Sequence, residues 1–197
     1  GFVLWKASFA IAISYVNIGV IHLAQNNYAE ALQNYLIALK IYEELGLKKG
    51  IAMTSNNIGV IYEEQGHYSE ALKNYSGSLK IKEEIDDKEG MVASYISMGS
   101  VLLKMSGKGS AFTNERKQAK LYLNKALILS LETGLKEAVK ESYHGLYTLD
   151  SCLNLSKSAL ANYKMYISYG DSLQNEDNTK KMVQSEKSGV MFTLDPI

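Results

Sequence analysis

Few residues of this chain have a type and spacing that could carry out chemistry. The three histidines, His22, His67 and His144, fall at unrelated points of the sequence, and no two have the spacing of metal ligands. The single cysteine, Cys152, excludes an internal disulfide and a cysteine-based zinc site, and we expect it to be a small buried apolar residue. No glycine-rich phosphate loop or nucleophile elbow is present. The sequence therefore predicts no catalytic residue, no metal site and no cofactor, and we do not expect an enzyme.

Two asparagines are the polar residues with the most regular spacing. Asn17 and Asn57 are forty residues apart, and each opens the same pentapeptide, Asn-Ile-Gly-Val-Ile. A primary amide both donates and accepts hydrogen bonds, so it can bind the backbone of an extended peptide. The alternative is that both amides face solvent or link adjacent helices. Ser97 and Gly145 occupy the next two matching positions and interrupt the amide series.

The asparagines belong to a repeat with a period of forty residues. Glycines 19, 59 and 99 mark this period, and the sequence Tyr-Ala-Glu-Ala-Leu-Gln-Asn-Tyr at 28–35 returns as Tyr-Ser-Glu-Ala-Leu-Lys-Asn-Tyr at 68–75. A fixed period of roughly 20–50 residues indicates a solenoid, in which each unit packs against its neighbours. Because solenoids present extended surfaces, the repeat favours a binding function over a catalytic pocket.

Apolar residues within each unit recur at steps of three and four, which is typical of amphipathic helices. Glycine and asparagine, which favour helix ends and turns, separate these periodic segments. The pattern predicts helices at about 9–25, 29–45, 50–65, 69–85, 90–106, 117–132, 136–152 and 157–173. Since the intervening loops are short, neighbouring helices should pack as antiparallel hairpins.

Composition excludes some classes of partner. The 21 basic and 21 acidic residues balance, so the chain lacks the positive charge that nucleic acid requires. We find no apolar run of the roughly 20 residues that span a membrane and no signal peptide, so we expect no direct membrane insertion. The chain does not begin with methionine, and we interpret it as a piece of a longer protein or a processed form. The compartment, cytoplasmic or periplasmic, stays open.

These repeats resemble the tetratricopeptide repeat family. In that family, small residues lie where the two helices of a hairpin approach, and large residues fill the space between hairpins. The matching positions are Gly19, Ala31, Tyr35 and Ala38, then Gly59, Ala71 and Tyr75, then Gly99, Ala119 and Ala126. The longer period resembles a subgroup found in kinesin light chains, mitotic-spindle adaptors and bacterial peptide-sensing regulators. The resemblance implies an all-α fold, a right-handed superhelical solenoid of antiparallel helix hairpins with about four units and a C-terminal extension.

The resemblance covers about residues 9–173. It implies four units at about 9–48, 49–88, 89–134 and 135–173, preceded at 1–8 by the end of another helix or an N-terminal cap, and followed at 174–197 by a polar connecting segment and tail. In the third unit, Gly99 and Ala119 are twenty residues apart, whereas the matching pairs of the first two units are twelve apart, so eight residues are inserted. Its Gly/Ser-rich stretch at 106–116 predicts an inserted mobile loop, with Phe112 at the tip.

In this family the first helix of each hairpin lines a concave binding groove. The resemblance therefore places a peptide-binding groove at Val16, Asn17, Val20, Asn56, Asn57, Val60, Ile96, Ser100 and His144. The implied function is non-enzymatic binding of a protein or peptide segment. Because residues 163–181 resemble the exit of repeat arrays in bacterial sensor proteins, we expect a sensory or scaffolding region of a bacterial signalling protein. The alternatives are a structural spacer or homodimerisation module that pairs through an exposed array end, and the regulatory half of a larger kinase or transcription regulator.

Overall fold

A computed structural model describes residues 2–107 and 113–188, and in these residues it contains helices and no strand. The helices are α1 (Phe2–Ala24), α2 (Tyr28–Glu44), α3 (Lys48–Glu64), α4 (Tyr68–Glu84), α5 (Lys88–Met105), α6 (Asn114–Thr133), α7 (Lys136–Cys152) and α8 (Ser156–Ser188). Each corresponds to one of the helices that the apolar periodicity predicts. The all-α solenoid of helix hairpins is therefore confirmed.

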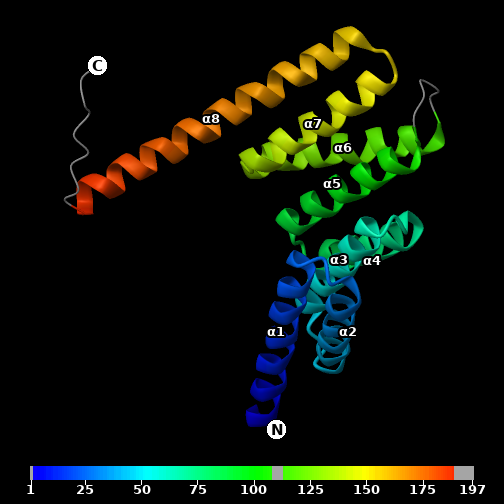
Figure 1. Cartoon of the computed structure of the whole chain (residues 1–197), viewed down its shortest axis with the longest axis vertical. Coiled ribbons are helices and arrows are strands. Elements are labelled where there is room, and N and C mark those ends of the chain that lie inside the picture. Colours follow the sequence, from blue (N-terminus) through cyan, green and yellow to red (C-terminus); the bar gives the residue numbers. More distant parts are fainter. Residues whose placement is uncertain (1, 108–112, 189–197) are drawn as a thin grey trace.

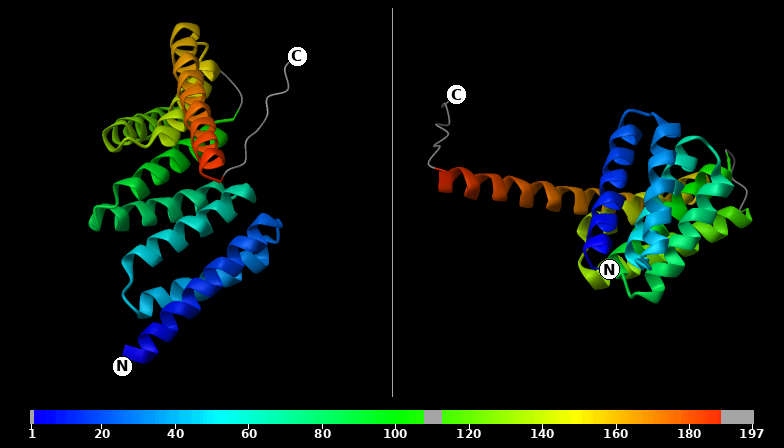
Figure 2. Two further views of the ribbon diagram at one scale, coloured as in Figure 1. Left: turned by 90° about the vertical axis from the view of Figure 1, so that its left-hand side faces the viewer. Right: turned by 90° about the horizontal axis from the view of Figure 1, so that it is seen from below.

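Consecutive helices pair as hairpins, and the hairpins stack in the order of the sequence (Figure 1). The α1–α2 pair lies at one end of the stack and the α7–α8 pair at the other. Figure 2 shows that the C-terminal part of α8 extends beyond the stacked hairpins. Most packing is therefore between neighbours in sequence, as in a solenoid.

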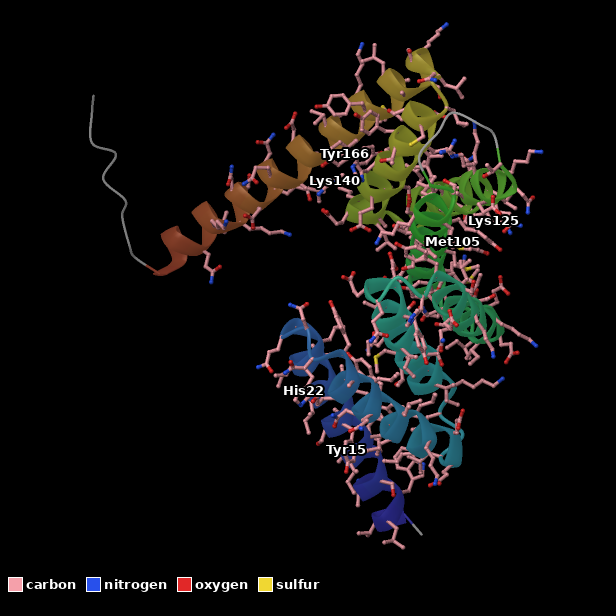
Figure 3. All side chains as sticks on the ribbon, turned by 45° about the vertical axis from the view of Figure 1, so that its right-hand side comes forward. Tyr15, His22, Met105, Lys125, Lys140 and Tyr166 are labelled. Atoms are coloured by element: carbon pink, nitrogen blue, oxygen red, sulfur yellow. The ribbon has the colours of Figure 1, made fainter. Side chains whose placement is uncertain are left out.

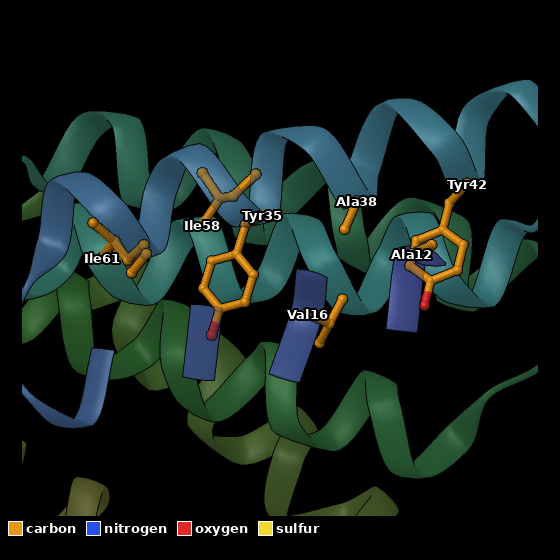
Figure 4. Close-up of a cluster of buried hydrophobic side chains, with 8 residues drawn as sticks. Ala12, Val16, Tyr35, Ala38, Tyr42, Ile58 and Ile61 are labelled. Atoms are coloured by element: carbon orange, nitrogen blue, oxygen red, sulfur yellow. The ribbon is translucent and has the colours of Figure 1, made fainter. Parts of the chain in front are cut away.

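Each hairpin buries its apolar residues partly against its own partner helix and partly against the next hairpin. In the first core cluster, Tyr35, Ala38 and Tyr42 of α2 pack with Ile58 and Ile61 of α3 (Figure 4). A second cluster repeats this arrangement between α4 and α5. Burying each of the larger side chains stabilises the fold by roughly 1.5–3 kcal/mol, so the interface between hairpins is a main source of stability.

Glycines allow the two helices of a hairpin to approach closely. A Cβ atom on Gly19 would lie 2.6 Å from Cε1 of Tyr35, and one on Gly59 would lie 2.7 Å from Cε1 of Tyr75. The aromatic rings of α2 and α4 therefore leave no room for a side chain at either glycine. In the turns that follow α2 and α3, Gly46 and Gly66 take positive φ angles of 66° and 76°, which is the left-handed conformation that commonly ends a helix.

The ends of the array differ from the expected boundaries. Residues 2–8, expected to close a preceding helix or form a cap, are instead continuous with α1. Trp5 and Phe9, one helical turn apart, stack at 5.6 Å between ring centroids. Residues 174–188, expected as a polar connecting segment, continue α8 without a break. No proline or other strong helix breaker interrupts either segment, so the helices extend beyond their packed parts.

The inserted loop is shorter than the sequence pattern suggested, because α6 already begins at Asn114. The Thr113 hydroxyl caps α6 by accepting a hydrogen bond from the backbone N–H of Arg116 at 3.3 Å. The guanidinium of Arg116 is buried, and it donates to Ser106 Oγ at 3.1 Å and to the Gly107 carbonyl at 3.0 Å. Arg116 thus ties the start of α6 to the end of α5. Residues 108–112, including Phe112, lie outside the described residues.

Helix α1 corrects the expectation that no segment is long and apolar enough to span a membrane. Its residues Val3–Ala24 have a mean hydropathy of 1.7, which satisfies that test by length and composition. A core helix of a soluble protein and an N-terminal signal sequence satisfy the same test, so it is weak evidence for insertion. In the structure α1 packs on α2 through Ala12 and Val16, with other apolar side chains left exposed.

Candidate peptide-binding groove

The predicted groove residues all lie on the first helices of the four hairpins, which are α1, α3, α5 and α7. Asn17 and Val20 of α1 are exposed. Asn57 and Val60 of α3 and Ser100 of α5 are half-buried. Because these side chains occupy the same two repeat positions, they form a series from one helix to the next. We call the surface formed by the first helices the groove face.

Two predicted residues lie mainly beneath this surface. Val16 is 6% exposed and packs in the first core cluster, so it offers little surface to a ligand. Asn56 is half-buried, and its Oδ1 atom is buried without a hydrogen-bond partner in the described part of the chain. Ile96, at the same repeat position on α5, is half-buried beside the second hydrophobic cluster. This position therefore contributes more to the floor of the groove face than to its outer surface.

The last predicted residue lies at the hairpin formed by α7 and α8. His144 is exposed, and its ring lies 5.1 Å from that of Tyr166 and 6.3 Å from that of Tyr147, measured between centroids. Figure 3 labels Tyr166 on α8 and Lys140 on α7 in the same region. His144 is thus part of an aromatic cluster that joins the last two helices.

A hydrogen-bonded network fixes the spacing of the middle helices. The Tyr75 hydroxyl of α4 donates to Glu63 Oε2 of α3 at 2.7 Å, and the Lys104 ammonium of α5 donates to Glu63 Oε1 at 2.8 Å. Burial, followed by the hydrogen bond and charge of Glu63, raises the pKa of Tyr75. The hydrogen bond to Glu63 likewise raises the pKa of Lys104. Glu63 therefore links three consecutive helices.

Two pockets open on the first helices. A pocket of about 360 Å³ lies between α1 and the start of α3, where Phe9, Ile13 and Met53 supply much of its apolar lining. A second pocket, of about 560 Å³, lies among α5, α7 and α8, and Ile96 and Leu173 contribute to it. We call them the N-terminal pocket and the C-terminal pocket.

Sequence reasoning did not find most of the residues that line these pockets. The N-terminal pocket uses Tyr42 and Leu47, which belong to the end of α2 and the following turn. The C-terminal pocket uses Leu173 and Glu176 of α8, a helix that the repeat pattern assigns to the outer layer. Ile13 and Met53 share one repeat position on the first helices, which the sequence alone associates with the groove, but the contributions of other helices require the structure.

Metal-ligating side chains and the single cysteine are further candidates for chemistry. Among them, no group of three or more histidine, cysteine, aspartate or glutamate side chains could hold a metal ion. Cys152 is exposed, which corrects the expectation that it is buried. It lies at the C-terminal end of α7, where the helix meets the turn to α8.

The stacked hairpins and the surface of their first helices define the chain as a helical-repeat scaffold. Comparison with protein families identifies the repeat: residues 10–84 match the tetratricopeptide repeat model, so this part of the chain carries tetratricopeptide repeats. That match covers the first two hairpins. Such repeats generally mediate interactions between proteins and are typically not catalytic. No curated protein matches the chain by sequence.

Solved structures support the same architecture over a greater length. The crystal structure of BtubC (BKLC) from P. vanneervenii superposes with a TM-score of 0.71 and covers 94% of this chain and 67% of that one. The two sequences are 14% identical, so this similarity concerns the fold alone. It extends the helical-repeat arrangement well past residue 84, where the family match ends.

Proposed function

We propose that the chain is a non-enzymatic module that binds an extended protein or peptide segment along the groove face. The observation that carries this proposal is the series of side chains at two repeat positions, in which Asn17 and Val20 are followed by Asn57 and Val60. The amides offer donors and acceptors to a peptide backbone, and the valines offer apolar contact. Ser100 continues the series on α5 with a hydroxyl group.

The long C-terminal helix supports a narrower role for this module. Helix α8 extends to Ser188, well past the part that packs on α7 (Figure 2). A rigid helix that leaves a repeat array can connect it to a further domain. We therefore propose that the module is the sensory or scaffolding region of a bacterial signalling protein, in which segment binding is passed on through α8.

A random 12-residue peptide library, selected on the wild-type chain, tests the binding function. The test variant is Asn17→Leu/Asn57→Leu, which removes both amides from the groove face. Two lost hydrogen bonds at about 1 kcal/mol each should weaken the selected peptides by about tenfold or more. Circular dichroism should show unchanged helicity.

The repeat offers a matched control in Asn34→Leu/Asn74→Leu. These two asparagines are also forty residues apart, but they lie on α2 and α4, where each amide bonds the backbone one turn earlier. This control should keep the affinity of the wild type. Equal affinity for wild type and both variants would show that the peptides bind elsewhere.

Exposed side chains on α1 favour a second candidate function, self-association through the end of the array. Ile18 is 42% exposed, whereas Ile58 and Met98, at the same repeat position, are 3% and 4% exposed. Ile21 is likewise 57% exposed, although its counterpart Ile61 is fully buried under α2. Light scattering should show a concentration-dependent dimer that Ile18→Ser/Ile21→Ser abolishes. A strict monomer at all concentrations would exclude this candidate.

A further inference from the structure

The two pockets of the groove face differ in charge as well as in position. We propose that the groove face holds its bound segment in one direction, an inference that rests on the proposed segment binding. An apolar side chain of the segment occupies the N-terminal pocket, and a lysine or arginine occupies the C-terminal pocket. The partner is thus a flexible protein segment with an apolar anchor and a basic residue at a fixed spacing.

The N-terminal pocket is suited to an apolar anchor. Phe9, Ile13 and Met53 line it together with the ring of Tyr42, and no carboxylate contributes to the lining. Its charged members are lysines; Lys48 is paired with Glu84 at 3.0 Å. A volume of about 360 Å³ accommodates one aromatic or branched aliphatic side chain. An aromatic side chain buries about 150–250 Å² of surface, which a small residue could not supply.

The C-terminal pocket is suited to a long cationic side chain. Its floor is apolar, with Ile96 and Leu173, while four glutamates and one lysine contribute to the lining. The ammonium of that lysine, Lys136, is paired with Glu176. Arginine and lysine bury their aliphatic stems on apolar surface while keeping the charged group at the polar rim. An acidic rim above an apolar floor therefore complements this kind of side chain.

Two of the glutamates remain available for a cation. Glu137 is paired with Lys140, and Glu176 with Lys136. Glu89 and Glu141 are exposed and have no ion pair in the part of the chain that the structure describes. They lie on α5 and α7, on two sides of the same pocket. A basic side chain placed between them would contact both helices.

The change in character follows the repeat. The position occupied by Phe9 in α1 is taken by Lys49, Glu89 and Glu137 in α3, α5 and α7. The position of Ile13 is taken in turn by Met53, Ala93 and Glu141. Both positions are thus apolar in the first unit and acidic in the fourth, with the basic Lys49 at one of them in the second unit. This difference between the ends gives the surface a direction that identical repeats would lack.

The distance between the pockets sets the spacing in the bound segment. The pockets are two repeats apart. Close packing at about 8–10 Å between axes would separate them by roughly 16–20 Å. Because α1 and α3, and likewise α3 and α5, share few close backbone contacts, the separation is larger than that. An extended chain advances about 3.3 Å per residue, so more than about five residues separate the two anchors. Asn57 lies one helical turn beyond Met53 on α3, and Ser100 lies one turn beyond Ile96 on α5, so both are close to the path from one pocket to the other.

The selected library peptides test this directly, because the library itself carries no bias. Peptides that bind the wild type should be enriched in an apolar residue and a lysine or arginine at one fixed spacing of more than about five residues, in one order along the chain. Replacing that basic residue by glutamate in a synthetic peptide should weaken binding at least tenfold, as measured by fluorescence anisotropy.

Charge reversal in the protein provides the complementary test. Glu89→Lys/Glu141→Lys should weaken the basic peptide at least tenfold and restore binding of its glutamate version. Glu43→Lys/Glu44→Lys, which makes the same change in net charge at the end of α2, should alter neither affinity. Met53→Ser should weaken both peptides, because both use the N-terminal pocket.

The outcomes separate this inference from the proposed function. Peptides that bind, depend on Asn17 and Asn57, and show no preference for a basic residue would overturn the inference and leave segment binding intact. If the Glu89→Lys/Glu141→Lys variant still prefers peptides with a basic residue, the inference is also overturned. If the library yields no binder at all, the proposed function and the inference fail together.

Discussion

Gly59 lies against the ring of Tyr75 so closely that a methyl group on the glycine would be 2.7 Å from Cε1 of that ring. The contact joins the two helices of the second hairpin, α3 and α4. Gly19 and Tyr35 repeat it in the first hairpin, at 2.6 Å. The geometry of the groove face depends on it, because Asn57 and Val60 flank this glycine in the sequence.

Gly59→Ala should therefore destabilise the chain. Overpacking in a close-packed core costs about 1–3 kcal/mol, which exceeds the gain in helix propensity of at most about 1 kcal/mol. The free energy of unfolding in urea measures the effect. Gly77→Ala is the control, because a Cβ atom there meets nothing within 4 Å inside helix α4. That variant should be more stable by about 0.5–1 kcal/mol, and equal losses in both variants would contradict the packing argument.

The hydroxyl groups of Tyr75 and Tyr35 should contribute differently to stability. The Tyr75 hydroxyl donates to the Glu63 carboxylate, whereas the Tyr35 hydroxyl is buried without a partner in the described residues. A hydrogen bond to a charged group contributes about 1.5–3 kcal/mol, so Tyr75→Phe should cost that amount. Tyr35→Phe removes an unsatisfied polar group and should be neutral or stabilising. A larger loss for Tyr35→Phe than for Tyr75→Phe would contradict the network around Glu63.

The raised pKa of Tyr75 predicts a loss of stability in alkali. Because burial and the neighbouring Glu63 raise this pKa above its ordinary value of 10.0, the folded state holds the phenolic proton more tightly than the unfolded state. The contribution is complete below pH 10 and is lost as the pH rises through the folded-state pKa. The free energy of unfolding should fall less steeply above pH 10 in Tyr75→Phe than in wild type. Parallel pH profiles would exclude this role.

Buried Lys82 should reduce the stability of the chain. Its ammonium donates to Ser94 Oγ at 2.9 Å, and burial lowers its pKa, with partial opposition from the charge of Asp87. Replacing a buried charge by an apolar side chain of similar size often stabilises a protein, so Lys82→Met should gain about 1 kcal/mol at neutral pH. The gain should shrink toward pH 10.5, the ordinary pKa at which the unfolded amine also loses its charge. A loss of stability in Lys82→Met would show that the buried ammonium is well compensated.

The sequence was sufficient to predict the eight helices and the solenoid, because the spacing of small and aromatic residues repeats almost unchanged in the first two units. Gly19 and Tyr35 have the same spacing in the sequence as Gly59 and Tyr75, so the sequence alone relates each glycine to its tyrosine. Local periodicity determines this packing, so no knowledge of distant contacts is needed.

Features that depend on contacts between different helices could not be predicted in the same way. Burial of Arg116 follows from its bonds to Ser106 and Gly107, across a loop with no counterpart in the other units. The C-terminal pocket combines residues from three helices, including Glu176, which lies just past the end of the expected repeat array. The family resemblance places Val16 in the groove because it lies on a first helix, yet its side chain packs in the first core cluster.

The central claim, that a segment binds along the first helices, is tested most directly by mapping amide chemical shifts on the assigned, isotope-labelled chain as a selected library peptide is added. We expect the largest shifts on α1, α3 and α5 around Asn17, Asn57 and Ser100, with small shifts on α2, α4 and α6. Shifts concentrated on the second helices, or confined to the exposed outer side of α1 near Ile18 and Ile21, would contradict the account and place the binding surface elsewhere.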